Sequence, residues 1–288
     1  MHFTDRLAAA VRAKGTALCV GLDPRRESLP ASLTARHPNT AAAYEEFCLR
    51  VLDIVAPVAP VVKPQSAFFE ACGPAGSAAL KNVLVRAKQL GLVTILDAKR
   101  GDIASTATAY AEAAFDAFDA DALTVNPYLG RDAVEPFITR ARYDGRGLFV
   151  LVRTSNPGAA LFQDLTCAGE PLYRHVGDAV AGWGRAHLGT CGFGDVGAVV
   201  GATHPAELKH LRACLPDVWF LVPGYGAQGG TAADVRLGFR ADGLGAIVNS
   251  SRGVTFPFKA DETGWEAKID AAARTAAAEL ALAPAGVC

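Results

Sequence analysis

The stretch LVTILDAKRGD, residues 92–102, places a short β-forming run directly before a cluster of charged residues. The run Leu92–Leu96 is almost wholly apolar, which is typical of a strand buried on both faces in a parallel sheet. Similar runs recur along the chain, each bounded by turn residues. They are Ala17–Leu22, Val58–Val62, Ala122–Val125, Gly147–Val152, Val196–Val200, Val218–Val222 and Ala246–Val248.

Helical patterns separate these runs. They cover Thr40–Val55, Ser77–Leu90, Ile103–Phe118, Asp132–Ala141, Leu172–His187, Pro205–Cys214 and Thr231–Phe239. Buried strands that alternate with helices form a parallel sheet covered on its outer face, and eight such units can close into a barrel. We therefore predict an α/β fold, a single-domain (β/α)8 (TIM) barrel over residues 1–288. A doubly wound open sheet is the rival, but it would place the site near the first strand, whereas polar residues here follow many strands.

Two segments stand apart from this pattern. The alanine-rich tail Ala271–Val287 predicts a final helix that frays into a disordered end over roughly the last ten residues. The glycine-rich stretch Gly182–Gly197 predicts a loop before the sixth strand.

Composition limits the class of protein. Lys and Arg total 28 against 29 for Asp and Glu, with no basic tail, so no nucleic-acid partner is expected. No run approaches the roughly 18 apolar residues of a membrane span, and the N-terminal residues lack a secretory leader, which predicts a cytoplasmic address. Seven scattered cysteines form no Cys-x-x-Cys pair. This pattern predicts reduced, mostly buried thiols and no zinc site.

The carboxyl ends of the strands build the active site of such a barrel, so the polar residues there are the candidates. They are Asp23, Lys63, Asp97, Lys99, Asn126, Thr154-Ser155-Asn156, Gln228 and Arg252. Asp97 and Lys99 stand two apart, which predicts that both face the barrel interior. With Lys63 from the adjacent strand and Asp102 at the next helix, an alternating array of charges becomes plausible. Ion pairs that merely plug the barrel mouth are the structural alternative, but four charges at adjacent strand ends favour function.

A second cluster follows the last two strands. The glycine-rich segment Pro223–Gly230 and the segment Asn249–Gly253 occupy the loops that commonly bind phosphate in these barrels. Arg252 would supply a charge-assisted contact and Gln228 a neutral one. A glycine-rich loop alone more often marks a tight turn, but the arginine after the eighth strand favours a phosphate site.

Asp97-Ala98-Lys99-Arg100-Gly101-Asp102-Ile103 with Thr106 resembles the Asp-x-Lys-x-x-Asp signature of orotidine 5'-phosphate decarboxylases, in their longer bacterial branch. The short signature also occurs in sugar-phosphate enzymes of the same superfamily, whereas the full series of matching segments is much more specific. These segments are Val20–Pro24, Val62–Gln65, Arg153–Gly158, Gly197–Thr203, Pro223–Gly230 and Ser250–Gly253.

The resemblance implies decarboxylation of orotidine 5'-phosphate (OMP) to uridine 5'-phosphate (UMP) without metal or organic cofactor, the last step of de novo UMP synthesis. It implies that Lys99 donates a proton to pyrimidine C6, that Asp97 lies near the departing carboxylate, and that Lys63 and Asp102 complete the array. The implied substrate contacts are Asp23 with the ribose, Ser155 with the pyrimidine, Gln228 and Arg252 with the phosphate, and Pro223 and Ser251 alongside them. It also implies a homodimer in which Asp102 and Thr106 reach the neighbouring subunit's ribose.

Two other functions fit parts of this pattern. A metal-dependent sugar-phosphate lyase or decarboxylase of the same superfamily would share the signature, but those relatives carry a magnesium-binding glutamate where this chain has Lys63. A non-catalytic nucleotide-binding barrel would keep the phosphate loop and lose part of the charge array, yet every member of the array is present.

Overall fold

The computed structural model describes residues 1–226 and 229–282. Its centre is a closed parallel barrel with the strand order β1-β10-β9-β8-β5-β4-β3-β2. The bounds are β1 Leu18–Leu22, β2 Val61–Pro64, β3 Val93–Arg100, β4 Ala122–Val125, β5 Gly147–Arg153, β8 Val196–Val200, β9 Phe220–Val222 and β10 Ala246–Ser250. The predicted (β/α)8 barrel is confirmed.

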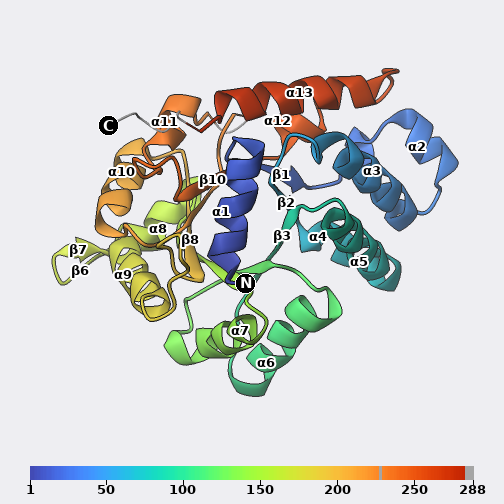
Figure 1. Cartoon of the computed structure of the whole chain (residues 1–288). Helices are drawn as coiled ribbons and strands as arrows, with labels where there is room; N and C mark the ends of the chain where they lie inside the picture. Colours follow the sequence, from blue (N-terminus) through green and yellow to red (C-terminus); the bar gives the residue numbers. More distant parts are fainter. Residues whose placement is uncertain (227–228, 283–288) are drawn as a thin grey trace.

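Helices surround the barrel (Figure 1). They are α1 Phe3–Lys14, η1 Arg26–Ser28, α2 Ala31–Arg36, α3 Thr40–Val55, α4 Ser66–Glu70, α5 Gly73–Gln89, α6 Ala104–Glu112, η2 Ala113–Ala117, α7 Arg131–Tyr143, η3 Pro157–Ala159, α8 Ala160–Gln163, α9 Leu172–Gly184, α10 Pro205–Cys214, α11 Ala232–Arg236, α12 Arg252–Thr255 and α13 Trp265–Glu279. No helix within the described residues is long and apolar enough to cross a membrane.

The second strand differs from its predicted range. Val58–Val62 was expected, but the N–H groups of Val58 and Ala59 bond back to the carbonyl of Val55 and continue the turn after α3. The strand therefore begins at Val61 and runs to Pro64, which places Lys63 within it. The eighth strand is longer than expected, because Asn249 and Ser250 pair with Cys19 and Val20 of β1.

Helices α3 and α10 have their predicted bounds, whereas the other predicted helices differ at one or both ends. The predicted helix Thr231–Phe239 ends at Arg236, because the next three N–H groups bond to carbonyls only three residues back. The range Ile103–Phe118 divides into α6 and a π-helical turn, η2. The final helix begins at Trp265, well before Ala271, because the buried Trp265 side chain packs on the core. The predicted disordered end includes 283–288, which lie outside the described residues.

Helix α1 was not predicted, and it closes the N-terminal end of the barrel, lying across the centre of the ring in Figure 1. Its apolar face, which includes Phe3, Leu7 and Val11, packs with the interior side chains of the strands. The Phe3 ring meets Phe149 edge to face at 6.1 Å between centroids. A side chain at Gly147 would collide with the Phe3 ring, since a Cβ there would lie 2.1 Å from it. The barrel therefore opens only at the carboxyl ends of its strands.

The segment Gly182–Gly197 contributes to this closed end. Only the part of this segment between the end of α9 and the start of β8 is a loop, and this loop is hydrogen-bonded to α1. The Asp5 carboxylate accepts hydrogen bonds from Thr190 N at 3.0 Å and from Cys191 N at 2.8 Å, while Thr4 Oγ1 donates to the Phe193 carbonyl at 2.9 Å. The loop is thus structural and lies away from the strand ends that carry the candidate site.

A small antiparallel hairpin, β6 Thr166–Cys167 with β7 Glu170–Pro171, lies between β5 and α9 and was also not predicted. The expectation of mostly buried cysteines was wrong for the described residues. Cys19 and Cys48 are buried, but Cys167 on the hairpin is exposed and three others are half-buried.

Candidate active site

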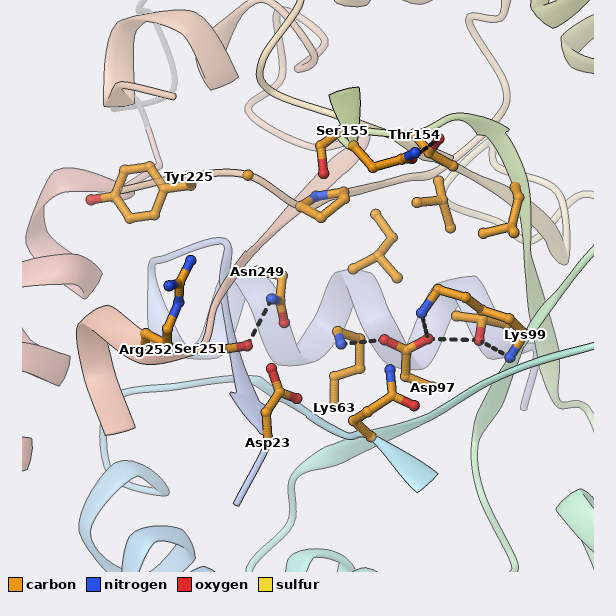
Figure 2. A pocket seen from close by; sticks show the side chains of 18 of the residues that line it. Asp23, Lys63, Asp97, Lys99, Thr154, Ser155, Tyr225, Asn249, Ser251 and Arg252 are labelled. Atoms are coloured by element: carbon orange, nitrogen blue, oxygen red, sulfur yellow. Dashed lines mark hydrogen bonds and ion pairs between the residues drawn. The ribbon is translucent and has the colours of Figure 1, made fainter. Parts of the chain in front are cut away.

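A cavity of about 640 Å³ opens at the carboxyl ends of the strands. The predicted site residues that line it are Asp23, Lys63, Asp97, Lys99, Ser155, Pro223, Ser251 and Arg252. Figure 2 shows them converging from different elements, with Lys99 and Arg252 at opposite ends of the view. The barrel thus brings most of the predicted residues into one site.

Asp97 is the centre of a charged array. Its carboxylate accepts a hydrogen bond from Lys63 Nζ at 2.5 Å and another from Lys99 Nζ at 2.6 Å. Asp97 and Lys63 are each only 5% exposed, whereas the Lys99 side chain is 46% exposed and reaches into the cavity. The three groups carry one net positive charge, and the accessible part of that charge is the Lys99 ammonium.

The buried pair holds its charges firmly. Burial alone would raise the pKa of Asp97, but the ammoniums of Lys63 and Lys99 outweigh it and hold that pKa well below 3.8, its ordinary value. Burial alone would lower the pKa of Lys63, but the Asp97 and Asp23 carboxylates outweigh it and hold that pKa above 10.5. Ionised Asp97 therefore stabilises the fold at pH values above 3.8, its ordinary pKa. Protonated Lys63 stabilises the fold at pH values below 10.5, its ordinary pKa. The Lys63–Asp97 pair therefore stays charged across the neutral range.

A local irregularity in β3 delivers Lys99 to Asp97. The β3–β4 register passes from Leu96 opposite Leu123 to Arg100 opposite Val125, so the residues Asp97–Lys99 oppose the single residue Thr124. Lys99 has a φ of 47°, a conformation that is costly for a residue with a side chain. Simple alternation along a regular strand, on which the prediction depended, is therefore not what aligns the two side chains.

Thr124 stabilises this bulge and was not predicted as a site residue. Its hydroxyl accepts from the backbone N–H groups of Ala98 at 3.0 Å and Lys99 at 2.9 Å, and it donates to Asp97 Oδ1 at 2.9 Å. The only signal in the sequence is one hydroxyl within the apolar run Ala122–Val125, next to the strand that carries Asp97.

Asp102 does not join the array within one chain. Its carboxylate accepts from its neighbour Ile103 N at 2.8 Å, and it contacts no lysine among the described residues. Thr106 lies on α6 with its side chain exposed, and neither residue lines the cavity. Within one chain the structure therefore brings together Lys63, Asp97 and Lys99 but not Asp102, and the part of Asp102 in the array stays a prediction.

Asp23 and Ser251 both line the cavity (Figure 2). Asp23 Oδ1 is buried and has no hydrogen-bond partner among the described residues. Such an orphan acceptor costs about 1–3 kcal/mol until a donor reaches it. Ser251 Oγ accepts from Asn249 Nδ2 at 3.2 Å. Gly21 makes room for this serine, since a Cβ there would lie 1.9 Å from Ser251 Oγ.

Arg252 carries another charge of the cavity. It begins α12, it is exposed, and its guanidinium makes no ion pair or hydrogen bond with any residue that the structure describes. The neighbouring loop after β9 turns sharply, with Gly224 at a φ of 96°, and Gly226 N donates to the Gly230 carbonyl at 2.8 Å. The Tyr225 hydroxyl points away from the cavity and donates to Glu279 of α13. Gln228, predicted to bind phosphate, lies outside the described residues.

Other polar residues line the cavity without having been assigned a role in the predicted site. They are Arg25, Gln65, Thr124, Thr154, Asn156, Gln163, Tyr225 and Asn249. Thr154 and Asn156 follow a strand and were among the polar strand-end residues, whereas Gln163 returns to the cavity from α8. Asn126, also a strand-end residue, instead caps the turn at Tyr128 N, 3.0 Å away.

Comparison with known proteins places this site in a family. A profile described as "Orotidine 5'-phosphate decarboxylase / HUMPS family" matches residues 16–260. The chain belongs to this family. A protein of Rhodopirellula baltica named orotidine 5'-phosphate decarboxylase is 47% identical over 94% of this chain and 96% of its own. One of the same name from Clostridium kluyveri is 40% identical over 91% of this chain and 90% of its own.

Solved structures of this family agree with the fold. The structure of Leishmania donovani OMP decarboxylase is 40% identical and covers 97% of both chains with a TM-score of 0.79. A structure from Streptomyces avermitilis, described as a putative orotidine 5'-phosphate decarboxylase, is 35% identical with a TM-score of 0.80 and covers 97% of this chain and 94% of its own. The family resemblance predicted from the motifs is thus confirmed over nearly the whole chain.

Proposed function

We propose that this chain catalyses the decarboxylation of OMP to UMP and CO2, the last step of UMP synthesis, with Lys99 as the proton donor and without metal or organic cofactor. The observation that supports it best is the buried Asp97 carboxylate held between Lys63 at 2.5 Å and Lys99 at 2.6 Å, in a cavity whose other end carries Arg252. The direct test is to incubate the purified protein with OMP and measure UMP and CO2, which should form in equal amounts.

The cavity suggests one orientation of the nucleotide. The 5'-phosphate would bind Arg252, whose guanidinium has no ion-pair partner among the described residues and is ready for a bidentate contact, together with Gln228 and the Pro223 loop. A ribose hydroxyl would donate to the unsatisfied Asp23 Oδ1. The pyrimidine would then lie between Ser155 and the charged array, with C6 facing Lys99.

The reaction needs this arrangement. When the bond between C6 and the carboxylate breaks, both electrons stay on C6 in the plane of the ring, where no adjacent carbonyl delocalises them. The Lys99 ammonium stabilises this developing charge and then transfers a proton from Nζ to C6, giving UMP and CO2. Solvent reprotonates Lys99 afterwards. A charge already fixed in place by Asp97 needs little reorganisation during the reaction.

Asp97 has two roles in the proposed reaction. It holds Lys63 and Lys99 in position, and it would lie near the substrate carboxylate before that group leaves as neutral CO2. Two carboxylates placed close together repel each other, and the repulsion is relieved in the transition state as the negative charge moves from the substrate carboxylate to C6.

The metal-dependent alternative fits this site poorly. In those relatives the position of Lys63 holds a glutamate that binds magnesium, whereas here an ammonium lies 2.5 Å from Asp97 and would repel a divalent cation. Within residues 1–226 and 229–282 no group of three or more His, Cys, Asp and Glu side chains could hold a metal ion. A non-catalytic nucleotide-binding barrel would have no use for a buried Lys-Asp-Lys array that costs desolvation energy.

Arg252→Ala should weaken UMP binding by about 10- to 100-fold, because a charge-assisted contact to phosphate contributes about 1.5–3 kcal/mol. Uridine, which has no phosphate, should bind the variant and the wild type equally. Isothermal titration with both ligands measures the effect. Unchanged affinity for UMP would show that the phosphate binds elsewhere.

We also propose a homodimer with shared active sites. Asp102 and Thr106 lie outside the cavity of their own chain, where a second subunit can meet them. The segments that follow β3 and its neighbour β4 carry exposed apolar side chains: Ile103 is 56%, Tyr128 83% and Leu129 49% exposed. Such a patch on the rim of a polar site is typical of a protein interface.

Complementation tests the shared site. Lys99→Ala and Asp102→Asn should each be nearly inactive as homodimers. When the two variants are co-expressed, about half of the dimers are mixed and each mixed dimer has one intact site, so about a quarter of the wild-type activity should return. If every site were built within one chain, co-expression would restore nothing.

The assignment of residues 1–288 to one domain and the cytoplasmic location stay predictions from the sequence. The barrel strands span Leu18–Ser250, and α1 and α13 pack on different cores that share the strands of this one barrel, which supports one domain. The cytoplasmic location is predicted from the N-terminal sequence alone, and cell fractionation tests this prediction.

A further inference from the structure

Arg153, the last residue of β5, carries a charge that the proposed reaction does not use. Its side chain is only 2% exposed, although a buried guanidinium is stable only when its charge and its N–H groups are satisfied. Nε lies 2.5 Å from Glu207 Oε2, and Nη2 lies 3.1 Å from Asp164 Oδ1. Nη1 donates to Gln163 Oε1 at 3.3 Å, and the Tyr173 ring lies 5.5 Å away.

These contacts join two separate elements. Glu207 belongs to α10, which packs against the barrel through the buried Leu208 and Leu211, and is therefore a fixed support. Gln163 and Asp164 end α8, which lies on the polar segment between β5 and the β6–β7 hairpin. Arg153 is thus a link between the rigid barrel and the segment that returns to the cavity.

Gln163 connects Arg153 to a residue of the cavity, Thr154. Its Oε1 accepts from Thr154 N at 2.9 Å, and its Nε2 donates to Thr154 Oγ1 at 2.8 Å. The Arg153 carbonyl accepts from Gly201 N at 2.8 Å, at a register shift between β5 and β8. Both the backbone and the side chain of Arg153 therefore determine where Thr154 and Ser155 lie.

Thr154, Ser155 and Gln163 line the cavity together, and we call them the base wall. In Figure 2 Thr154 and Ser155 lie along the side of the cavity that faces the Asp97 and Lys99 array. In the proposed orientation of the nucleotide this is the pyrimidine end, whereas Arg252 and the phosphate lie at the other end.

We infer that Arg153 is a positioning residue for pyrimidine recognition, which acts through Gln163 on the base wall and touches no substrate itself. This inference depends on the proposed function, because the base wall needs a nucleobase to recognise. The planar guanidinium is essential to it, since only a fork of several N–H groups can bind Glu207, Asp164 and Gln163 at once.

Arg153→Lys tests the inference with the charge retained. A lysine ammonium can pair with Glu207 but cannot also reach Gln163. The ion pair with α10 should therefore remain, while Gln163 and the rest of the base wall should become less well positioned. The affinity for UMP should fall by at least about tenfold, a difference of about 1.4 kcal/mol. The affinity for ribose 5-phosphate, which has no base, should not change, and the ratio of the two affinities is therefore the readout.

Arg142→Lys is the matched control. Arg142 also forms a partly buried bidentate pair, with Nε at 2.6 Å and Nη2 at 3.0 Å from the Asp195 carboxylate, but at the closed end of the barrel. This variant should lose thermal stability while keeping both affinities. Gln163→Leu leaves Arg153 paired with Glu207 and should show the same base-selective loss, so it decides the question if Arg153→Lys does not fold.

The two levels of the hypothesis can fail separately. If the wild type binds UMP no better than ribose 5-phosphate, the proposed function fails. If the wild type discriminates between them, and Arg153→Lys and Gln163→Leu keep the wild-type ratio or weaken both ligands equally, Arg153 has only a structural role and the inference is wrong.

Discussion

Lys99→Ala should lower the turnover of OMP by at least about 10⁴-fold, because one side chain supplies both the proton and the charge that stabilises the C6 anion. UMP should still bind with near-normal affinity, since the contacts of Arg252 and Asp23 lie elsewhere in the cavity. Lys99 is the exposed member of the array, so its removal leaves Asp97 paired with Lys63 at 2.5 Å and the fold intact. Steady-state kinetics and titration with UMP measure the two effects.

Lys81→Ala is a suitable control for this variant. Lys81 is exposed on α5, and its ammonium makes no ion pair or hydrogen bond with another described residue, so its removal should change neither turnover nor affinity. A Lys99→Ala variant with near-normal kcat would contradict the mechanism.

Asp97→Ala should reduce both stability and activity. It leaves the Lys63 ammonium buried without a counter-charge, which typically costs about 3–5 kcal/mol. The midpoint of thermal unfolding should therefore fall by roughly 10 °C. Turnover should collapse as well, because neither Lys99 nor Lys63 retains its partner. Calorimetry and the decarboxylation assay report the two losses.

The double variant Asp97→Leu/Lys63→Met separates the two losses. Replacing both charges with apolar side chains of similar volume is often neutral for stability, so the midpoint should return close to the wild-type value. Lys99 is half exposed and remains solvated. Activity should stay absent. Recovery of activity together with stability would show that Asp97 serves only the fold.

The strands of the barrel were largely predictable from the sequence, because a strand buried on both faces leaves a continuous apolar run between polar ends. Helix α1 was missed. It precedes the first strand and so lies outside the alternation of strands and helices, and its place across the barrel depends on non-local contacts such as Phe3 with Phe149. The predicted range of β2, Val58–Val62, begins and ends too early for a similar reason. Whether Val58 lies in a strand or in a turn depends on its hydrogen bond to the Val55 carbonyl.

The candidate site was predictable where it consists of charges that directly follow strands. Asp97, Lys63, Asp23 and Arg252 all line the cavity as expected. The sequence could not reveal the bulge that aligns Lys99, because its left-handed backbone is imposed by the hydroxyl of Thr124 from another strand. Gln163 was missed for the same reason, since only the folded segment after β5 brings it back to the cavity.

The decarboxylation assay with EDTA present tests the central claim most directly. We expect the absorbance of OMP to fall when the purified protein is added, at a rate that neither EDTA nor added magnesium changes. No fall in absorbance, or activity that EDTA removes and magnesium restores, would contradict the claim that the Lys63–Asp97–Lys99 array supports the reaction without a metal ion.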